Sequence, residues 1–443
     1  MKSLVLAEKP SVARDIARVL GCHKNISGAI EGSNYIVTWA LGHLVTLADP
    51  EEYDKKFKAW DISYLPMVPK KWELVVIKQT SKQYHNVKTQ LFRKDVSDII
   101  IATDAGREGE LVARWILDKS GCHKPIRRLW ISSVTDKAIK EGFAHLKDGR
   151  AYNNLYHAAR SRAEADWLVG INATRALTCK YNAQLSCGRV QTPTLAMIAH
   201  REQQIRSFKP EDYYGLRCTT SVTGGSVGTT ASIVTWTWQQ KKSGSLRSFN
   251  KDLITGLDKK LKNQTLTVTD VHTSSKRTPS PGLYDLTELQ RDANKRFGFS
   301  AKETLNIMQS LYEHHKVLTY PRTDSRYIGT DIVPTIKERL KACNIGPYKK
   351  YIPELLKKPL KTSKAFVDDK KVSDHHAIIP TEEYVQMEHM SNNERKIYDL
   401  VVRRFISVLY PAFEYEQTTL KAEAAGETFT AKGKVIKAAG WKA

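Results

Sequence analysis

The sequence is poor in cysteine and has no long apolar run. Its six cysteines are scattered through 443 residues, and none of them forms the closely spaced pairs of a zinc ribbon. This pattern argues against a zinc ribbon and favours free thiols in a reducing cytosol. No run approaches the roughly 18 apolar residues that a membrane-spanning helix needs. The N-terminal apolar run carries Glu8, so we expect a strand there rather than a signal peptide.

Acidic residues are also scarce relative to basic ones. The chain has 70 Lys+Arg against 47 Asp+Glu, a net charge of +23, and a pI of about 9.6. Such an excess favours a polyanionic partner, which is most often nucleic acid. A ribosome-associated protein and a membrane-surface protein are the alternatives at this point.

The first 145 residues alternate short apolar runs with helical patterns. Leu4–Ala7, Tyr35–Ala40 and Asp98–Thr103 predict strands, and Ser11–Leu20 and Glu110–Lys119 predict helices. Alternation of this kind is typical of a mostly parallel sheet with helices on both faces.

The next part of the chain changes from helical to strand-like patterns. Residues 146–210 are dense in helix formers, whereas 211–239 and 264–274 alternate with a period of two. The latter pattern is typical of antiparallel strands with one solvated face. Between them, residues 240–262 predict a loop with one short helix.

Helix signals return at residue 285. Asp285 and Ser300 each precede a glutamate by three residues, which is the arrangement of a capping box. A predicted helix at about 393–408 is followed by alternating segments at 418–424 and 427–435. We therefore expect the chain to re-enter the antiparallel sheet that it left near residue 274.

An acidic turn follows the predicted strand that ends at Thr103. Residues 104–110 read Asp-Ala-Gly-Arg-Glu-Gly-Glu, and the first strand delivers Glu8 to the same sheet edge if the two strands are neighbours. Crowded carboxylates repel unless a cation joins them, and oxygen ligands suit Mg²⁺. A solvated acidic loop is the alternative. Lys9 could form a salt bridge or contact a phosphate at the helix N-terminus.

Tyr320 is a candidate nucleophile. Pro321 disfavours the helical region for Tyr320, and Arg322 places a permanent cation two residues from the phenol. A phenol becomes a useful nucleophile only when nearby cations favour its developing charge. A buried core tyrosine is the alternative.

Two further segments contain candidate binding groups. Ser186–Thr194 combines small residues, an arginine, an amide and hydroxyls that could contact phosphate and sugar, although a plain helix-entry loop has a similar composition. Trp167 lies among Arg160, Arg162 and Arg175, an arrangement similar to a track on which single-stranded bases stack. His375 and His376 point in different directions, so at most one is expected to reach a reaction centre.

Together these segments resemble the type IA DNA topoisomerases, and most closely the bacterial topoisomerase III branch. The resemblance rests on five motifs in order: Glu8-Lys9-Pro10-Ser11, residues 104–110, residues 186–195, residues 318–325 and residues 375–380. It extends over essentially the whole chain.

The resemblance implies a multidomain α/β plus α+β fold that would form the type IA toroid. It implies a Rossmann-like Toprim metal-binding domain (1–145), a winged-helix-like helical DNA-binding domain (146–210) and a β-rich arch (211–280). A catalytic tyrosine domain (281–410) and the start of the returning arch (411–443) would follow. Because the chain stops inside that return, we expect an incomplete toroid and a fragment of a longer product.

The resemblance also implies roles for individual residues. Tyr320 would attack one strand and form a 5′-phosphotyrosine, Arg322 would stabilise charge, and Lys9 would protonate the leaving 3′-oxygen. Glu8 and Asp104 would hold Mg²⁺ with help from Glu108. The implied supporting and strand-contacting residues are Arg162, His375, Trp60, Trp167, Arg175, Ser186, Cys187, Gly188, Arg189, Val190 and Gln191.

One departure concerns the metal, since many members of the family have a second aspartate where this chain has Gly106. The implied substrates are single-stranded DNA and negatively supercoiled or catenated DNA, acted on by a monomer. The implied location is the bacterial cytoplasm, at the nucleoid or a plasmid. The alternative is a fragment that binds single-stranded DNA without full strand passage.

Overall fold

A computed structural model describes residues 1–132, 134–222, 232–372 and 375–443. The chain forms two compact units. The first consists of Met1–Ile198 and Gly282–Ile406, and the second of Ala199–Pro281 and Ser407–Ala443.

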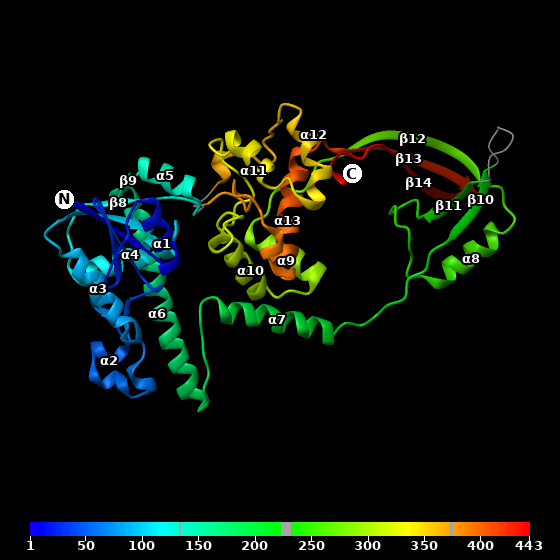
Figure 1. Cartoon of the computed structure of the whole chain (residues 1–443). Coiled ribbons are helices and arrows are strands. Elements are labelled where there is room, and N and C mark those ends of the chain that lie inside the picture. The colour runs from blue at the N-terminus through cyan, green and yellow to red at the C-terminus, as the bar shows by residue number, and fades with distance from the viewer. Residues whose placement is uncertain (133, 223–231, 373–374) are drawn as a thin grey trace. The chain divides into compact units, whose positions relative to one another are not determined.

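The first unit contains a mixed sheet in the order β2-β3-β4-β1-β7-β8-β9 (Figure 1). Strands β4, β1, β7 and β8 are parallel, and β3 and β9 pair antiparallel at the two sides. A separate two-stranded sheet pairs β5 with β6. The strands of this unit are β1 (Lys2–Ala7), β2 (Lys24–Ile26), β3 (Ala29–Glu31), β4 (Tyr35–Trp39), β5 (Val45–Leu47), β6 (Leu74–Val76), β7 (Val96–Ala102), β8 (Ile126–Arg128) and β9 (Lys147–Asp148).

Apolar side chains cover both faces of this sheet. Successive residues of a strand point to opposite faces, so Leu4 and Leu6 join one core with Val87 of α3. Val5 and Ala7 join the other core with α1. The prediction of a parallel sheet buried on both faces is therefore confirmed.

The helices of the first unit begin and end at recognisable signals. Helix α1 begins at Pro10, a position that tolerates proline because its missing N–H needs no partner. Asp285 and Ser300 accept hydrogen bonds from the amides of Glu288 (2.7 Å) and Glu303 (3.1 Å), as predicted. The helices of this unit are α1 (Pro10–Val19), α2 (Pro50–Tyr53), α3 (Ser81–Leu91), α4 (Arg107–Ser120), α5 (Asp136–Ala144), α6 (Asn153–Tyr181), α9 (Leu286–Phe297), α10 (Ala301–Glu313), α11 (Ile336–Ala342) and α12 (Ile352–Leu356). Helices α7 (Gln191–Arg206) and α13 (Asn392–Leu409) each cross from one unit into the other.

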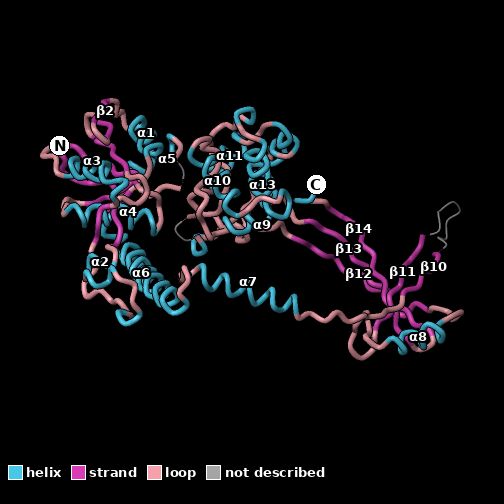
Figure 2. Tube along the Cα trace, turned by 90° about the horizontal axis from the view of Figure 1, so that it is seen from below, coloured by secondary structure: helices cyan, strands magenta, loops and turns pink. Residues whose placement is uncertain are grey.

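The second unit is an antiparallel sheet in the order β10-β11-β14-β13-β12, whose long strands are drawn side by side in Figure 2. The pairing of β12 with β13 confirms that the chain re-enters the sheet. Helix α8 (Lys251–Leu261) packs Ile254 and Leu257 against Trp236 and Trp238, so the short helix predicted within 240–262 is confirmed. The strands are β10 (Arg217–Val222), β11 (Ser232–Gln239), β12 (Thr267–Thr278), β13 (Phe413–Ala424) and β14 (Glu427–Ala438).

Strands β12, β13 and β14 are longer than the alternating segments of the sequence indicated. Most residues of β12 are exposed, so its ends lack the apolar alternation that marks a half-buried strand. Residues 223–231 of the predicted 211–239 region lie outside the described part of the chain. None of the described helices is long and apolar enough to cross a membrane.

Candidate active site

Two carboxylates meet at the carboxyl edge of the parallel sheet. Strands β1 and β7 are neighbours in a register that pairs Ala7 with Ala102, and the Asp104 amide donates a hydrogen bond to Glu8 Oε2 at 3.1 Å. Burial, reinforced by the charge of Asp104, raises the pKa of Glu8 to about 7. Burial also raises the pKa of Asp104, although the Lys9 ammonium opposes this shift. The predicted convergence of Glu8 and Asp104 is therefore confirmed.

The Glu8–Asp104 pair supplies two carboxylates for a divalent cation but no third protein ligand among the described residues. A cation between two buried carboxylates would relieve the repulsion that raises their pKa values, and Mg²⁺ is commonly held by one or two carboxylates with water and phosphate oxygens. The structure does not bring Glu108 to the pair. Glu108 lies 3.8 Å from His43 Nε2 and 3.6 Å from Arg162 Nη1, and these two partners lower its pKa. Within the described residues, no cluster of three or more His, Cys, Asp or Glu side chains is arranged to hold a metal.

Gly106 allows the metal site to be tested. It is the N-cap of α4 with an extended backbone, and a Cβ placed there meets no atom within 4 Å. Gly106→Asp adds a carboxylate two residues from Asp104, so we expect tighter Mg²⁺ binding by calorimetry at pH 8. Affinity should fall as the pH drops below about 7, because Glu8 then takes up a proton.

Gly106→Asn is the matched control, because asparagine caps a helix as well as aspartate does but carries no charge. Equal Mg²⁺ affinity in the Asp and Asn variants would mean that residue 106 points away from the ion.

Tyr320 lies against the two carboxylates. Its hydroxyl is 3.4 Å from Asp104 Oδ2, and the residue is 9% exposed. The Tyr320 amide donates to Ser132 O at 3.1 Å, while the preceding Thr319 amide donates to Ile379 O at 3.0 Å. Burial and the charges of Asp104 and Glu8 raise the pKa of Tyr320 well above its ordinary value, and the exposed Arg322 opposes this shift. The phenol is therefore protonated and needs added positive charge to become a nucleophile.

The ring of His375 lies against the ring of Tyr320. The two ring centroids are 4.3 Å apart at 32°, and His375 Nδ1 lies 3.2 Å from Ser132 Oγ. Burial lowers the pKa of His375 to about 4, so the ring is neutral at physiological pH. The His376 Nδ1 lies 2.7 Å from Ala377 O. Of the two histidines, only His375 lies against the tyrosine.

Lys9 reaches the site from the N-cap of α1. Its ammonium pairs with Glu313 Oε1, which also accepts a hydrogen bond from Gln309 Nε2. Glu313 was not predicted as a site residue, because it is 304 positions from Lys9 in the sequence. One indication of a polar cluster was present in the sequence: Gln309 and Glu313 are four residues apart on the helix that precedes Tyr320.

Two residues predicted to contact DNA are buried instead. Trp167 is 9% exposed, donates from Nε1 to Ala48 O at 2.9 Å and packs edge-on against Trp72. Arg175 is also buried, donates to Phe57 O at 2.5 Å and places its guanidinium 5.1 Å from the Trp60 ring centroid. Trp167 therefore offers no face for a base, and Arg175 supports the ring of Trp60, which is 52% exposed.

Residues 186–191 border an open cleft beside α6. The Cys187 amide donates to Thr174 Oγ1 at 3.0 Å, and Arg189 Nε donates to Asp166 Oδ1 at 2.6 Å. Arg162 lies on the same helix, with its Nε 3.9 Å from Asp166 Oδ2. The cleft has a volume of about 720 Å³ and is lined by Asp166, Gly170, Cys187, Gly188, Arg189, Val190, Gln191, Thr194, Leu195 and Ile198.

The first part of the chain is a mostly parallel sheet with an acidic edge. Its residues 3–134 match the Toprim domain family. Residues 150–443 match the DNA topoisomerase family, and the chain belongs to that family.

The chain is similar to curated DNA topoisomerase 3 proteins. It is 64% identical over 441 residues to that of Bacillus cereus (strain ATCC 14579) and 60% identical over 442 residues to that of Bacillus subtilis (strain 168). Each match covers 100% of this chain but 59% of the relative, so the chain spans about three fifths of their length. A solved structure of full-length topoisomerase I from Thermotoga maritima has the same fold, with a TM-score of 0.69 at 22% identity, covering 99% of this chain and 66% of that one.

Proposed function

We propose that this chain carries the strand-cleaving part of a type IA DNA topoisomerase and uses Tyr320 as the nucleophile. The observation that carries the proposal is the contact of the Tyr320 hydroxyl with Asp104, beside Glu8 and the Lys9–Glu313 pair. Carboxylates with raised pKa values cluster at functional sites, so the position of Tyr320 beside Asp104 and Glu8 supports a catalytic role.

In the proposed step, the Tyr320 oxygen forms a bond to phosphorus as the bond from phosphorus to the 3′-oxygen breaks. In this proposal Asp104 takes the phenol proton, and Lys9 protonates the leaving 3′-oxygen. Arg322 stabilises charge on the phosphate, while His375 orients the ring of Tyr320. A Mg²⁺ ion held by Glu8 and Asp104 would supply positive charge to the phosphate or to a neighbouring one.

The cleavage is reversible because one phosphodiester replaces another. Attack of the 3′-hydroxyl on the phosphotyrosine restores the strand, so the cycle needs no nucleotide as an energy source. We propose single-stranded regions of negatively supercoiled or catenated DNA as substrates, a monomer as the working form, and the cytoplasm of a bacterium, at the nucleoid or a plasmid, as the location.

The proposal is tested with a single-stranded oligonucleotide labelled at its 3′ end. A 5′-phosphotyrosine keeps the downstream fragment on the protein, so the label should migrate with the chain after denaturation in the presence of Mg²⁺. Label transfer from the 5′ end instead would contradict the proposed polarity.

A second candidate function is that of a topoisomerase fragment that binds single-stranded DNA without completing strand passage. The observation that favours it is the coverage of 59% of the curated relatives. Oligonucleotide cleavage and plasmid relaxation separate the two functions, because an adduct on Tyr320 supports the first, whereas binding with neither cleavage nor relaxation supports the second.

Binding should depend on Trp60. Stacking on an aromatic side chain contributes about 1–3 kcal/mol per base, so Trp60→Ala should weaken single-strand affinity by roughly five- to a hundredfold and duplex affinity much less. Phe92, which is also 52% exposed, is the control, and Phe92→Ala should leave both affinities unchanged. Fluorescence anisotropy at matched salt measures both, and an equal loss on duplex and single strand would show that Trp60 does not stack on bases.

A further inference from the structure

The cleavage site is assembled from two parts of the first unit. The Toprim body (residues 1–148) supplies Glu8, Lys9 and Asp104, and the tyrosine body (residues 282–406) supplies Tyr320 and Glu313. Because Tyr320 is buried between them, a DNA strand reaches it only when the two bodies separate at this contact. The contacts that hold the bodies together therefore control access.

Two of these contacts are ion pairs that solvent reaches. Lys316 pairs with Asp15 at 2.6 Å, and Lys137 pairs with Glu338 at 2.7 Å while both side chains are about half exposed. Exposed pairs of this kind contribute little, because water replaces each partner readily. These two ion pairs alone do not explain how the two bodies stay in contact.

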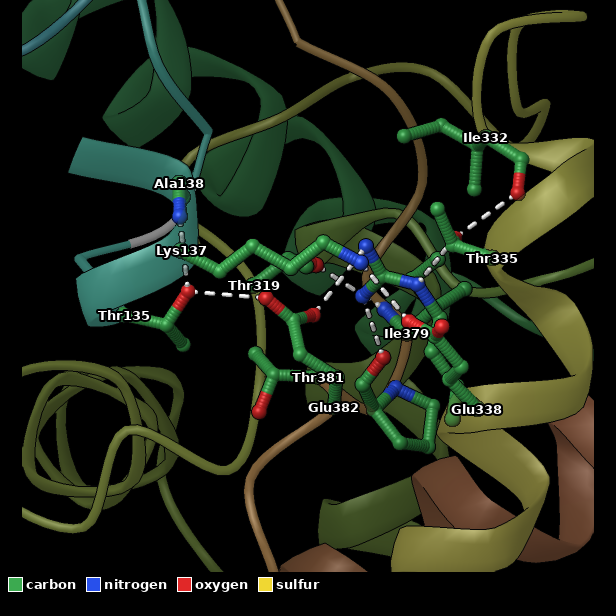
Figure 3. Close-up of polar contacts among 12 residues, drawn as sticks. Thr135, Lys137, Ala138, Thr319, Ile332, Thr335, Glu338, Ile379, Thr381 and Glu382 are labelled. Atoms are coloured by element: carbon green, nitrogen blue, oxygen red, sulfur yellow. Dashed lines mark hydrogen bonds and ion pairs between the residues drawn. The ribbon is translucent and has the colours of Figure 1, made fainter. Parts of the chain in front are cut away.

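A further polar contact joins the two bodies between Thr135 and Glu382 (Figure 3). Thr135, which is 1% exposed, donates from Oγ1 to Glu382 Oε1 at 2.8 Å, and Glu382 Oε2 lies 3.5 Å from Arg339 Nη2. Arg339 is itself buried and donates to Pro380 O at 2.7 Å and to Thr335 Oγ1 at 2.8 Å. The carboxylate of Glu382 thus lies near Arg339 of its own body and accepts a hydrogen bond from Thr135 of the Toprim body.

This contact is connected to the nucleophile through the backbone. Thr381, the neighbour of Glu382, donates from its amide to Val317 O at 3.0 Å and from its hydroxyl to Lys316 O at 2.6 Å. Leu318 forms a bridge with Pro380, and Tyr320 follows two residues later. Glu382 is therefore joined through Thr381 and Pro380 to the segment that carries Tyr320.

We infer that Glu382 is a positioning residue that clasps the tyrosine body to the Toprim body through Thr135. Loss of the clasp increases the fraction of molecules in which Tyr320 has left Asp104. The consequence for the reaction rests on the proposed function, whereas the clasp itself can be measured without DNA.

The measurement is hydrogen exchange at single-residue resolution on the whole chain. The Tyr320 amide bonds across the two bodies to Ser132, and the Thr319 amide bonds within the tyrosine body to Ile379, so the two amides distinguish separation of the bodies from local unfolding. In Glu382→Ala, the Tyr320 amide should exchange about ten- to a hundredfold faster while the Thr319 amide stays protected, because hydrogen bonds to charged groups have effects of this size.

Two further variants complete the test. Thr135→Val removes the same hydrogen bond from the opposite side, together with the N-cap bond that its hydroxyl accepts from the Ala138 amide at 3.2 Å. The Tyr320 amide should therefore exchange faster by at least the factor seen in Glu382→Ala, and adding Glu382→Ala to Thr135→Val should give no further increase. Glu338→Gln breaks the exposed pair between the same two bodies and should leave both amides unchanged within about twofold.

Unchanged exchange of the Tyr320 amide in both clasp variants would overturn the inference, as would equal acceleration of the reference amide of Thr319. If the parent chain cleaves oligonucleotides, the clasp variants should also accumulate several-fold more covalent adduct, since separation keeps the 3′-hydroxyl from the phosphotyrosine. Absence of cleavage in the parent would count against the proposed function, and the exchange result would still decide the clasp.

Discussion

Replacing Tyr320 with phenylalanine is expected to abolish the covalent DNA adduct while leaving DNA binding within about twofold. The substitution removes the hydroxyl oxygen that contacts Asp104 and keeps the ring that lies against His375. Loss of a catalytic nucleophile lowers a rate by a factor on the order of 10⁴–10⁶. The adduct, measured by transfer of a 3′-end label in Mg²⁺, should fall below detection.

Tyr312 is the matched control for this experiment. It is buried like Tyr320, and its ring lies edge-on to the ring of Tyr320 with centroids 5.4 Å apart. Tyr312→Phe also removes one hydroxyl from the same core, yet it should still form the adduct. An adduct that persists in Tyr320→Phe, or one lost equally in both variants, would refute the assignment of the nucleophile.

Replacing Lys9 with alanine should slow cleavage by about 10²–10⁴. The ammonium is held beside the carboxylates by Glu313, where it can give a proton to the leaving 3′-oxygen. Binding should change much less, because Lys9 is one cation among many and a single phosphate contact accounts for about one unit of salt slope. Single-turnover cleavage and affinity against salt separate the two effects.

Lys2→Ala is the control for the loss of charge. Lys2 is the first residue of β1, the strand that leads to Lys9, and it pairs with Glu31 at 2.6 Å, away from the acidic edge. It should leave the cleavage rate unchanged. If Lys9→Ala weakens affinity but cleaves at the parental rate once saturated, Lys9 is a phosphate contact and another group must protonate the 3′-oxygen.

Local patterns were sufficient for much of the fold. Buried strands such as Leu4–Ala7, the caps at Asp285 and Ser300, and the short helix in 240–262 follow from apolar spacing and from side chains that bond nearby amides. The ends of β12 were not predictable in the same way. An exposed strand carries no alternation, and its length is decided by its pairing with β13, a strand far along the chain.

The candidate site shows the same division. Glu8 and Asp104 were predictable as neighbours because the carboxyl ends of adjacent parallel strands share one sheet edge. The prediction that Trp167 contacts DNA was wrong, because the sequence around a tryptophan among arginines does not tell whether the side chain faces solvent or the core. Only packing against Tyr53 and Trp72 decided that it faces the core.

By itself the sequence determined the parallel sheet, the acidic edge, the extended tyrosine segment and the excess of basic charge. Each of these depends on residues close together in the chain or on the sum of all residues. The tertiary structure decided that Lys9 pairs with Glu313, that Glu108 turns towards His43 and Arg162, and that Glu382 reaches Thr135. The members of a pair are up to 304 positions apart in the sequence. No local pattern specifies the partner, because a charged side chain pairs with any opposite charge or hydrogen-bond donor that the folded backbone brings near.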